Sequence, residues 1–202
     1  MLAPSLMNAG AATDGISDQL FPDPFILPGY DAAGNLPLGV HSCTFDSLAV
    51  ATCFNEDRRR MWLQLMGFLA WPILNRNFRH AYIGGGFVST KPVPKDVDVV
   101  LETTSPYGPE AFTTVSRFFA AGLDQIEIIY GVHLQFWMKN APSEMADYRR
   151  FFQYARPDAF TAVLNRSRGI AKLALTGPEA IAGVRKHLRG EFRLEGQRSD
   201  RS

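Results

Sequence analysis

One stretch, residues 82–102, constrains the fold more than any other part of the chain. Its sequence, YIGGGFVSTKPVPKDVDVVLE, has an apolar lead-in that ends in three glycines, followed after nine residues by two aspartates that alternate with valines. Side chains on a β-strand alternate between its faces, so Asp96 and Asp98 should share one face while the valines enter a core. The stretch therefore predicts a glycine turn followed by a strand with two neighbouring carboxylates.

This arrangement predicts a site for a divalent cation and a phosphate group. Adjacent carboxylates repel each other, and a bound cation removes that cost. Mg²⁺, or Mn²⁺ in its place, suits one or two protein carboxylates combined with substrate phosphates, which makes Asp96 and Asp98 the expected metal ligands. Glycine backbone allows phosphates to approach closely and offers them N–H groups. The residues expected to contact a nucleotide are Gly84, Gly85, Gly86, Ser89, Thr90 and Lys91.

Each half of the pattern also has an ordinary structural interpretation. Three glycines between apolar runs can form a simple turn, and an Asp-x-Asp strand can be a sheet edge with a solvated acidic face. For either half alone, that interpretation would be preferred. The two halves at this spacing, with Lys91 and Lys95 between them, favour the combined site.

The pattern resembles the hG[GS]…Dh[DE]h signature of the polymerase-β-type nucleotidyltransferase superfamily, with Gly85 and Gly86 in the glycine place and Asp96-Val97-Asp98 in the paired-acid place. It is most similar to small uncharacterised bacterial and phage proteins of that fold, whose pattern is roughly G-S-F-V-T-x-K-x-x-P-N-D-I-D-L-V. The resemblance covers roughly residues 36–175, and only the central motif is highly specific. It implies an α+β fold in which helices flank a nucleotidyltransferase-like mixed β-sheet.

The resemblance also implies an activity. Proteins of this superfamily use Mg²⁺ to move a nucleoside monophosphate from a nucleoside triphosphate to a hydroxyl, and the acceptor here would be a protein, an RNA or a small molecule. The similar small proteins suggest a bacterial or phage setting, such as toxin–antitoxin or phage-defence systems, in which a toxin or another protein is a possible partner.

The third acid that related enzymes usually place on the next strand is missing from this sequence. His133 stands at that position, and we treat it as the third catalytic candidate, although imidazole suits Mg²⁺ less well than a carboxylate does. Asp124 and Glu127 are alternative acids, and only Glu127 would share the strand parity of His133. The substitution leaves a second hypothesis open: a catalytically inactive protein of this fold that acts as an antitoxin or a regulatory subunit.

The rest of the chain predicts one domain between two irregular ends. Residues 1–36 should form an extended or partly disordered segment, residues 37–189 the nucleotidyltransferase-like domain, and residues 190–202 a disordered tail. Helices are expected over 41–53, 56–75 with a kink or break at Pro72, 110–121, 143–154 and 178–188, and strands over 126–129, 132–137 and 169–175.

Composition limits the partners and the compartment. Of 202 residues, 46% are hydrophobic and 20% charged, which is typical of a soluble globular protein, and the net charge of +1 gives no general attraction to nucleic acid or membrane. A third hypothesis, nucleic-acid binding through Arg58–Arg60 and Arg149–Arg150, is therefore weaker than a solvated helix face. Cys43 and Cys53 indicate buried thiols in a reducing compartment. No apolar run is long enough to cross a bilayer and no signal peptide is evident, so we expect a cytoplasmic protein.

Overall fold

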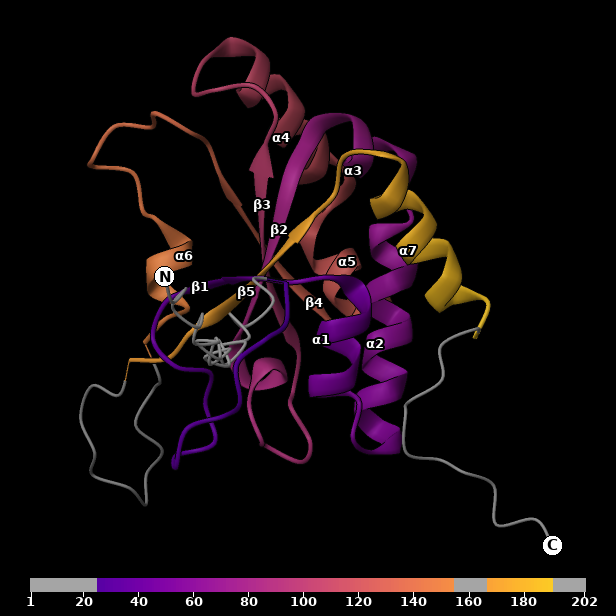
Figure 1. Ribbon diagram of the computed structural model, residues 1–202. Coiled ribbons are helices and arrows are strands. Elements are labelled where there is room, and N and C mark those ends of the chain that lie inside the picture. Colours follow the sequence, from indigo (N-terminus) through magenta and orange to yellow (C-terminus); the bar gives the residue numbers. More distant parts are fainter. Residues whose placement is uncertain (1–24, 155–166, 191–202) are drawn as a thin grey trace, which may run out of the picture.

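A mixed β-sheet lies at the centre of the protein (Figure 1). The computed structural model describes residues 25–154 and 167–190, and in them the strands follow the order β1-β5-β2-β3-β4. β2 is antiparallel to β3 and β5, whereas β1 pairs with β5, and β3 with β4, in parallel. The strands are β1 (Val40–Ser42), β2 (Phe78–Gly84), β3 (Val97–Thr103), β4 (Val132–Trp137) and β5 (Ile170–Ala174).

Helices surround this sheet, so the expected α+β class with a mixed sheet is confirmed. The 3₁₀ helix η1 (Gly85–Val88) follows β2 directly. In Figure 1, α2 and α7 lie on one side of the sheet and α6 on the other. The α-helices are α1 (Phe45–Thr52), α2 (Glu56–Leu69), α3 (Pro72–Asn77), α4 (Pro109–Ala121), α5 (Leu123–Tyr130), α6 (Tyr148–Phe151) and α7 (Pro178–Leu188).

The main core lies between one face of the sheet and the larger helices. Alternate residues of β3, such as Val97, Val99 and Leu101, are buried there together with Leu65 of α2 and Ile126 of α5. The alternation predicted for the aspartate strand is therefore present. Since residues of opposite parity face the other way, Asp98 and Glu102 lie on the face away from this core.

The second face of the sheet carries a smaller apolar cluster and a polar surface. Tyr82 of β2, Val100 of β3 and Ile170 of β5 pack there against Phe152, the residue that follows α6. Trp137 and Tyr148 cover the edge of this cluster. The short α6 thus lies over the sheet face that bears Asp98.

Several expected elements agree with the structure over most of their length. The helix expected over 41–53 is a short strand, β1, followed by α1, which Thr44 caps through a hydrogen bond from Ser47 N to its Oγ1. The helix expected over 56–75 ends at Leu69, and α3 begins at Pro72, as the break expected at that proline requires. The expectations for 110–121, 132–137, 169–175 and 178–188 match α4, β4, β5 and α7 to within one residue at either end.

Two expectations are wrong. Residues 126–129 belong to helix α5 rather than to a strand, and Gly131, in the left-handed conformation, ends that helix. The helix expected over 143–154 is confined to Tyr148–Phe151, because the segment before it forms turns and Asp147 supplies the N-cap. Of the apolar residues assigned to that helix, only Phe152 is buried.

The described part of the N-terminal segment docks on the domain. Leu27 and Leu36 are buried in the main core, and Leu27 N donates a hydrogen bond of 2.9 Å to Ser47 Oγ. The structures expected for residues 1–24 and 191–202 lie outside the described residues. Of the helices in the described part of the chain, none is both long enough and apolar enough to span a membrane.

Both cysteines are free and buried, as expected. Burial raises the pKa of the Cys43 thiol to about 12 and that of the Cys53 thiol to about 11. Thiols that stay protonated are poor nucleophiles and poor metal ligands, so both cysteines have a packing role.

Candidate active site

Asp98 lies where β2, β3 and β4 run side by side. In the sheet register it pairs with Gly84 on β2 and with His133 on β4. Its side chain is 15% exposed, and its Oδ1 lies 3.0 Å from His133 Nδ1. The glycines, the aspartate strand and the histidine identified in the sequence therefore meet at one end of the sheet.

Gly85 contacts the carboxylate of Asp98 directly. Its φ of +70° is a conformation that residues with a side chain rarely adopt, and a Cβ at this position would lie 1.9 Å from Asp98 Oδ2. Only glycine can satisfy both conditions. The spacing between the glycines and the aspartates is thus explained by a contact between them.

Asp96 lies one residue before β3 and two before Asp98, and its side chain is 25% exposed. Burial raises the pKa of Asp98, and the negative charge of Asp96 raises it further, whereas the hydrogen bond from His133 and the charge of Arg168 act in the opposite direction. The net shift is upward. The two carboxylates therefore interact, and a cation between them would relieve their repulsion.

His133 is oriented by two hydrogen bonds. Gln135 Nε2 lies 3.3 Å from His133 Nε2, and because an amide nitrogen can only donate, the imidazole accepts there and keeps its proton on Nδ1. That proton is donated to Asp98 Oδ1. His133 therefore holds Asp98 in place, and its lone pair is already engaged by Gln135.

The alternative acids do not reach this site. Asp124 and Glu127 belong to α5, which packs through Ile126 into the core on the opposite face of the sheet. The comparison of strand parity between Glu127 and His133 is therefore wrong, because Glu127 is not on a strand.

Asp96 and Asp98 are the residues of this site that could hold a divalent cation. The described residues contain no cluster of three or more His, Cys, Asp or Glu side chains suited to a metal ion, which excludes a closed cage within this part of the chain. Mg²⁺ commonly uses one or two protein carboxylates and completes its shell with water and substrate phosphates. The carboxylates of Asp96 and Asp98 are ligands of this type.

The residues expected to contact phosphates have different surroundings. Ser89 Oγ donates to Gly86 O at 2.8 Å and accepts from Lys91 N at 3.2 Å, so it closes the loop after η1. A Cβ at Gly86 would lie 3.4 Å from Lys91 Cδ, which places the lysine stem over this glycine. Gly86 and Lys91 are therefore brought together, and Lys91 is exposed.

Two of the residues expected to contact phosphates, Gly84 and Thr90, have other neighbours. A Cβ at Gly84 would lie 2.9 Å from Phe152 Cβ, so Phe152 covers this glycine. The side chain of Thr90 lies against Gly34 of the N-terminal segment, and Thr90 N donates to Gly34 O at 2.8 Å. Thr90 thus joins the loop to the N-terminal segment.

Arg58 was expected on a solvated helix face, and for this residue that interpretation is wrong. Arg58 is fully buried, whereas the neighbouring Arg60 side chain is 68% exposed and pairs with Asp57. The spacing contains a signal that explains the difference: Arg58 precedes Met61 and Leu65 by three and seven residues, on the apolar stripe of α2.

A second polar cluster lies at the other end of β3. Glu102 Oε2 accepts hydrogen bonds of 2.7 Å from both His80 Nδ1 and Tyr82 Oη. Burial alone would raise the pKa of Glu102, but these two bonds leave that pKa below its ordinary value. Glu102 shares the strand parity of Asp98, and this parity is the sequence signal that places both carboxylates on one face.

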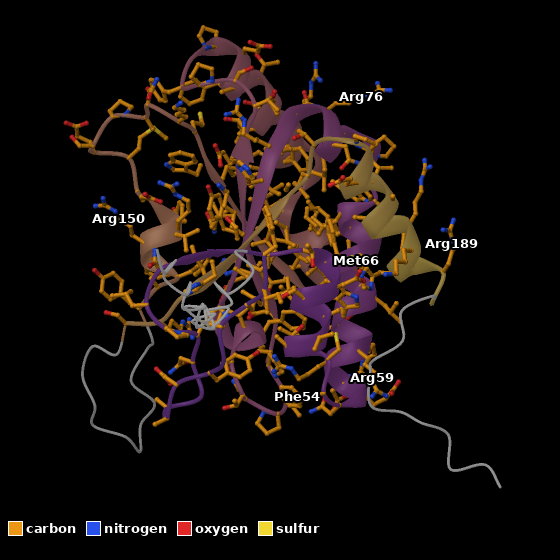
Figure 2. All side chains as sticks on the ribbon, in the orientation of Figure 1. Phe54, Arg59, Met66, Arg76, Arg150 and Arg189 are labelled. Atoms are coloured by element: carbon orange, nitrogen blue, oxygen red, sulfur yellow. The ribbon has the colours of Figure 1, made fainter. Side chains whose placement is uncertain are left out.

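The cations on this face are mostly engaged. The Arg149 guanidinium lies 3.4 Å from the centre of the Trp137 ring and binds both carboxylate oxygens of Asp147. Lys172 is half-buried, with Nζ 6.0 Å from the centre of the Tyr82 ring. Arg150 points away from the sheet (Figure 2). With Arg58 buried and Arg149 paired, the residues proposed for nucleic-acid binding do not form one exposed patch.

Comparison with known proteins adds a family but no activity. A model of DUF6932, described as a family of unknown function, matches residues 28–174. No curated protein and no solved structure matches the chain.

Proposed function

Because the chain belongs to DUF6932, whose function is unknown, we propose an activity from the site itself: a nucleotidyltransferase dependent on Mg²⁺ or Mn²⁺. It would transfer a nucleoside monophosphate from a nucleoside triphosphate to a hydroxyl of a protein, an RNA or a small molecule. The observation that carries the proposal is the contact between Gly85 and the carboxylate of Asp98, with Asp96 beside it. The resemblance of the motif to nucleotidyltransferases supports the same fold and chemistry.

Each residue of the site has a role in this proposal. Asp96 and Asp98 would hold the cation, which when bound would activate the attacking oxygen and neutralise the pyrophosphate that leaves. The backbone of Gly85 and Gly86, with the charge of Lys91, would bind the phosphates. His133 would keep Asp98 in its orientation. Catalysis would then depend on positioning and charge stabilisation.

The test is pyrophosphate release from each common ribonucleoside triphosphate with Mg²⁺ or Mn²⁺, together with transfer of the α-phosphate label to RNA or protein. We expect Asp96→Asn and Asp98→Asn each to reduce release at least about 100-fold, because even indirect partners of a metal contribute 10- to 100-fold. Asp124→Asn is the matched control, since this acid lies on α5, and it should retain full activity. Activity that survives in both site variants would refute the proposal.

A second candidate is an inactive protein of the same fold that binds nucleotide and acts as an antitoxin or a regulatory subunit with a toxin or other protein partner. The engagement of His133 by Gln135 favours it, because the position of the third acid then offers no free ligand. Nucleotide binding without pyrophosphate release would support this candidate over the enzyme. Both versions assign the protein to the cytoplasm, where the thiols of Cys43 and Cys53 would stay reduced.

A further inference from the structure

We propose that Arg58 is a positioning residue that holds the backbone of residues 85–91 in the shape that receives nucleotide phosphates. The inference rests on the proposed function, because it adds to the same site a residue that does not touch the substrate. It starts from an unusual feature: a fully buried guanidinium whose hydrogen-bond partners are backbone carbonyls.

The contacts of Arg58 tie the glycine segment to the start of α2. Its guanidinium donates to the carbonyls of Phe87, within η1, and of Lys91, at the end of the loop, and also to that of Thr52. Asn55, the N-cap of α2, adds a hydrogen bond of 2.8 Å from Nδ2 to Pro92 O. The start of α2 therefore fixes residues 85–91 at two carbonyls through Arg58, and the next carbonyl, that of Pro92, through Asn55.

No carboxylate neutralises Arg58 within the described part of the chain, where it forms no ion pair. Burial lowers its pKa, and its partners besides the carbonyls are aromatic: the guanidinium carbon lies 4.4 Å from the centre of the Phe54 ring and 5.2 Å from that of Phe87. Phe54, labelled in Figure 2, lies between α1 and α2. A buried cation without a counter-ion is costly, so its charge remains available to stabilise an anion nearby.

The geometry of the peptide bond explains how Arg58 acts at a distance. The peptide unit is planar, so fixing the Phe87 carbonyl fixes the Phe87–Val88 peptide of η1, the helix that also contains Gly85 and Gly86. Fixing the Lys91 carbonyl keeps the Lys91 stem over Gly86. Arg58 thus holds η1, with its glycine backbone, and the lysine stem in the positions on which phosphate binding would depend.

The test compares Arg58→Met, Arg58→Lys and the control Arg60→Met. Met fills much of the volume without charge or donors, Lys retains the charge without the planar fork, and Arg60 is an exposed arginine on the same helix. Hydrogen exchange of residues 85–91 reports on the loop, and titration with inorganic tripolyphosphate and Mg²⁺ reports on phosphate binding without depending on a base or on turnover.

We expect faster exchange confined to residues 85–91 in Arg58→Met, and an affinity for tripolyphosphate about tenfold to a hundredfold lower, which is the range for lost charged hydrogen bonds. Arg58→Lys should retain an intermediate affinity, and Arg60→Met should match the wild type in both measurements.

The outcomes separate this inference from the proposed function. Faster exchange throughout the domain, or a locally loosened loop with unchanged affinity, would overturn the positioning role. A wild-type protein that binds neither tripolyphosphate nor nucleotide would overturn the proposed function and this role together. In a further outcome, the wild-type protein binds tripolyphosphate more tightly than Arg58→Met yet releases no pyrophosphate from any nucleotide. That result would refute the enzyme and support the role of Arg58.

Discussion

Asp98 and Glu102 are two carboxylates on the same face of β3 whose surroundings have opposite effects. The first is buried beside Asp96, which makes its charged form unfavourable, so its pKa is raised. The second is buried with two strong donors, His80 and Tyr82, and its pKa is lowered. A stable fold has no need for the first arrangement, and such sites are common where a protein binds a ligand.

Neutral replacements should therefore have opposite effects on stability. At pH 7, Asp98→Asn should raise the melting temperature by about 2–4 °C, the shift that corresponds to about 1 kcal/mol in a domain of this size. Glu102→Gln should lower the free energy of unfolding by about 1.5–3 kcal/mol, because it loses hydrogen bonds to a charged acceptor. Thermal and urea unfolding of both variants provide the measurement.

The two carboxylates also have opposite effects on how stability depends on pH. Asp98 has a raised pKa, so the advantage of Asp98→Asn is complete above that pKa and shrinks as the pH falls toward the ordinary value of 3.8. Glu102 has a lowered pKa, so its contribution is present above the ordinary value of 4.5 and is lost as the pH falls through the lowered one. A stabilising effect of Asp98→Asn that grows on acidification would contradict this account.

Gly85 permits a second prediction about the same site. Gly85→Ala should lower the free energy of unfolding by about 2–5 kcal/mol, because the left-handed backbone costs about 1–2 kcal/mol and the clash with Asp98 adds to it. The control is Gly190→Ala, with a φ of +68° and no atom within 4 Å of the new Cβ, which should cost only the backbone part. Equal losses in the two variants would show that the contact with Asp98 is unimportant.

At the residue scale the sequence was informative where chemistry and spacing coincide. Gly85 and Asp98 were identified because few structures need three glycines before an Asp-x-Asp strand. Arg58 was missed because a cationic residue at a helix start is usually solvated, and its hydrogen-bond partners, Phe87 and Lys91, lie 29 and 33 residues away in the chain. Such distant contacts have no local signature.

At the element scale, α5 shows how a local pattern can mislead. Its β-branched isoleucines resemble a strand, yet Ile126 is buried while Ile128 and Ile129 are 74% and 58% exposed. Burial of one isoleucine among three is the result of helical periodicity. Glycines, Gly122 and Gly131, stand at the two ends of the helix. Both glycines are visible in the sequence, but there a helix C-cap at Gly131 cannot be told from a bulge or turn within strand material.

Alanine substitutions distinguish the two structures of this segment. In a strand, Ile126 and Ile128 would share one face and cost similar amounts, whereas in α5 they point in different directions. We expect Ile126→Ala to lower the free energy of unfolding by about 2–5 kcal/mol and Ile128→Ala to change it by about 0.5 kcal/mol or less. Urea denaturation provides both values, and comparable losses would favour a strand.

At the scale of the whole molecule, the sequence predicted a mixed sheet with helices but not how the ends of the chain assemble. β1 was missed because its three residues become a strand only by pairing with β5, which is 130 residues later for His41 and Ala171. The packing of α7 against α1 and α2 depends likewise on contacts between distant residues. His187 is at the centre of that packing.

His187 of α7 lies between Trp62 of α2 and Asp46 of α1. Trp62 Nε1, which can only donate, lies 3.3 Å from His187 Nδ1, so the histidine carries its proton on Nε2, 3.0 Å from Asp46 Oδ1. Protonation of His187 Nδ1 would place its N–H directly against the N–H of Trp62, and the hydrogen bond would be lost. Burial lowers the pKa of His187, and the charge of Lys186 lowers it too, although Asp46 acts in the opposite direction.

Stability should therefore fall on mild acidification. A histidine with a lowered pKa contributes fully above its unfolded value, near 6.5, and this contribution is lost as the pH falls toward the folded pKa, by at most about 1.4 kcal/mol per pH unit. Urea unfolding at pH 7.5 and 5.5 should show this loss in the wild type and a smaller one in His187→Asn. Trp62→Phe, which removes the opposing N–H but keeps the histidine, should give an intermediate loss. If His187→Asn is destabilised by acid as strongly as the wild type, the contact of α7 with α1 and α2 is not the source, and the acid sensitivity must come from the carboxylates.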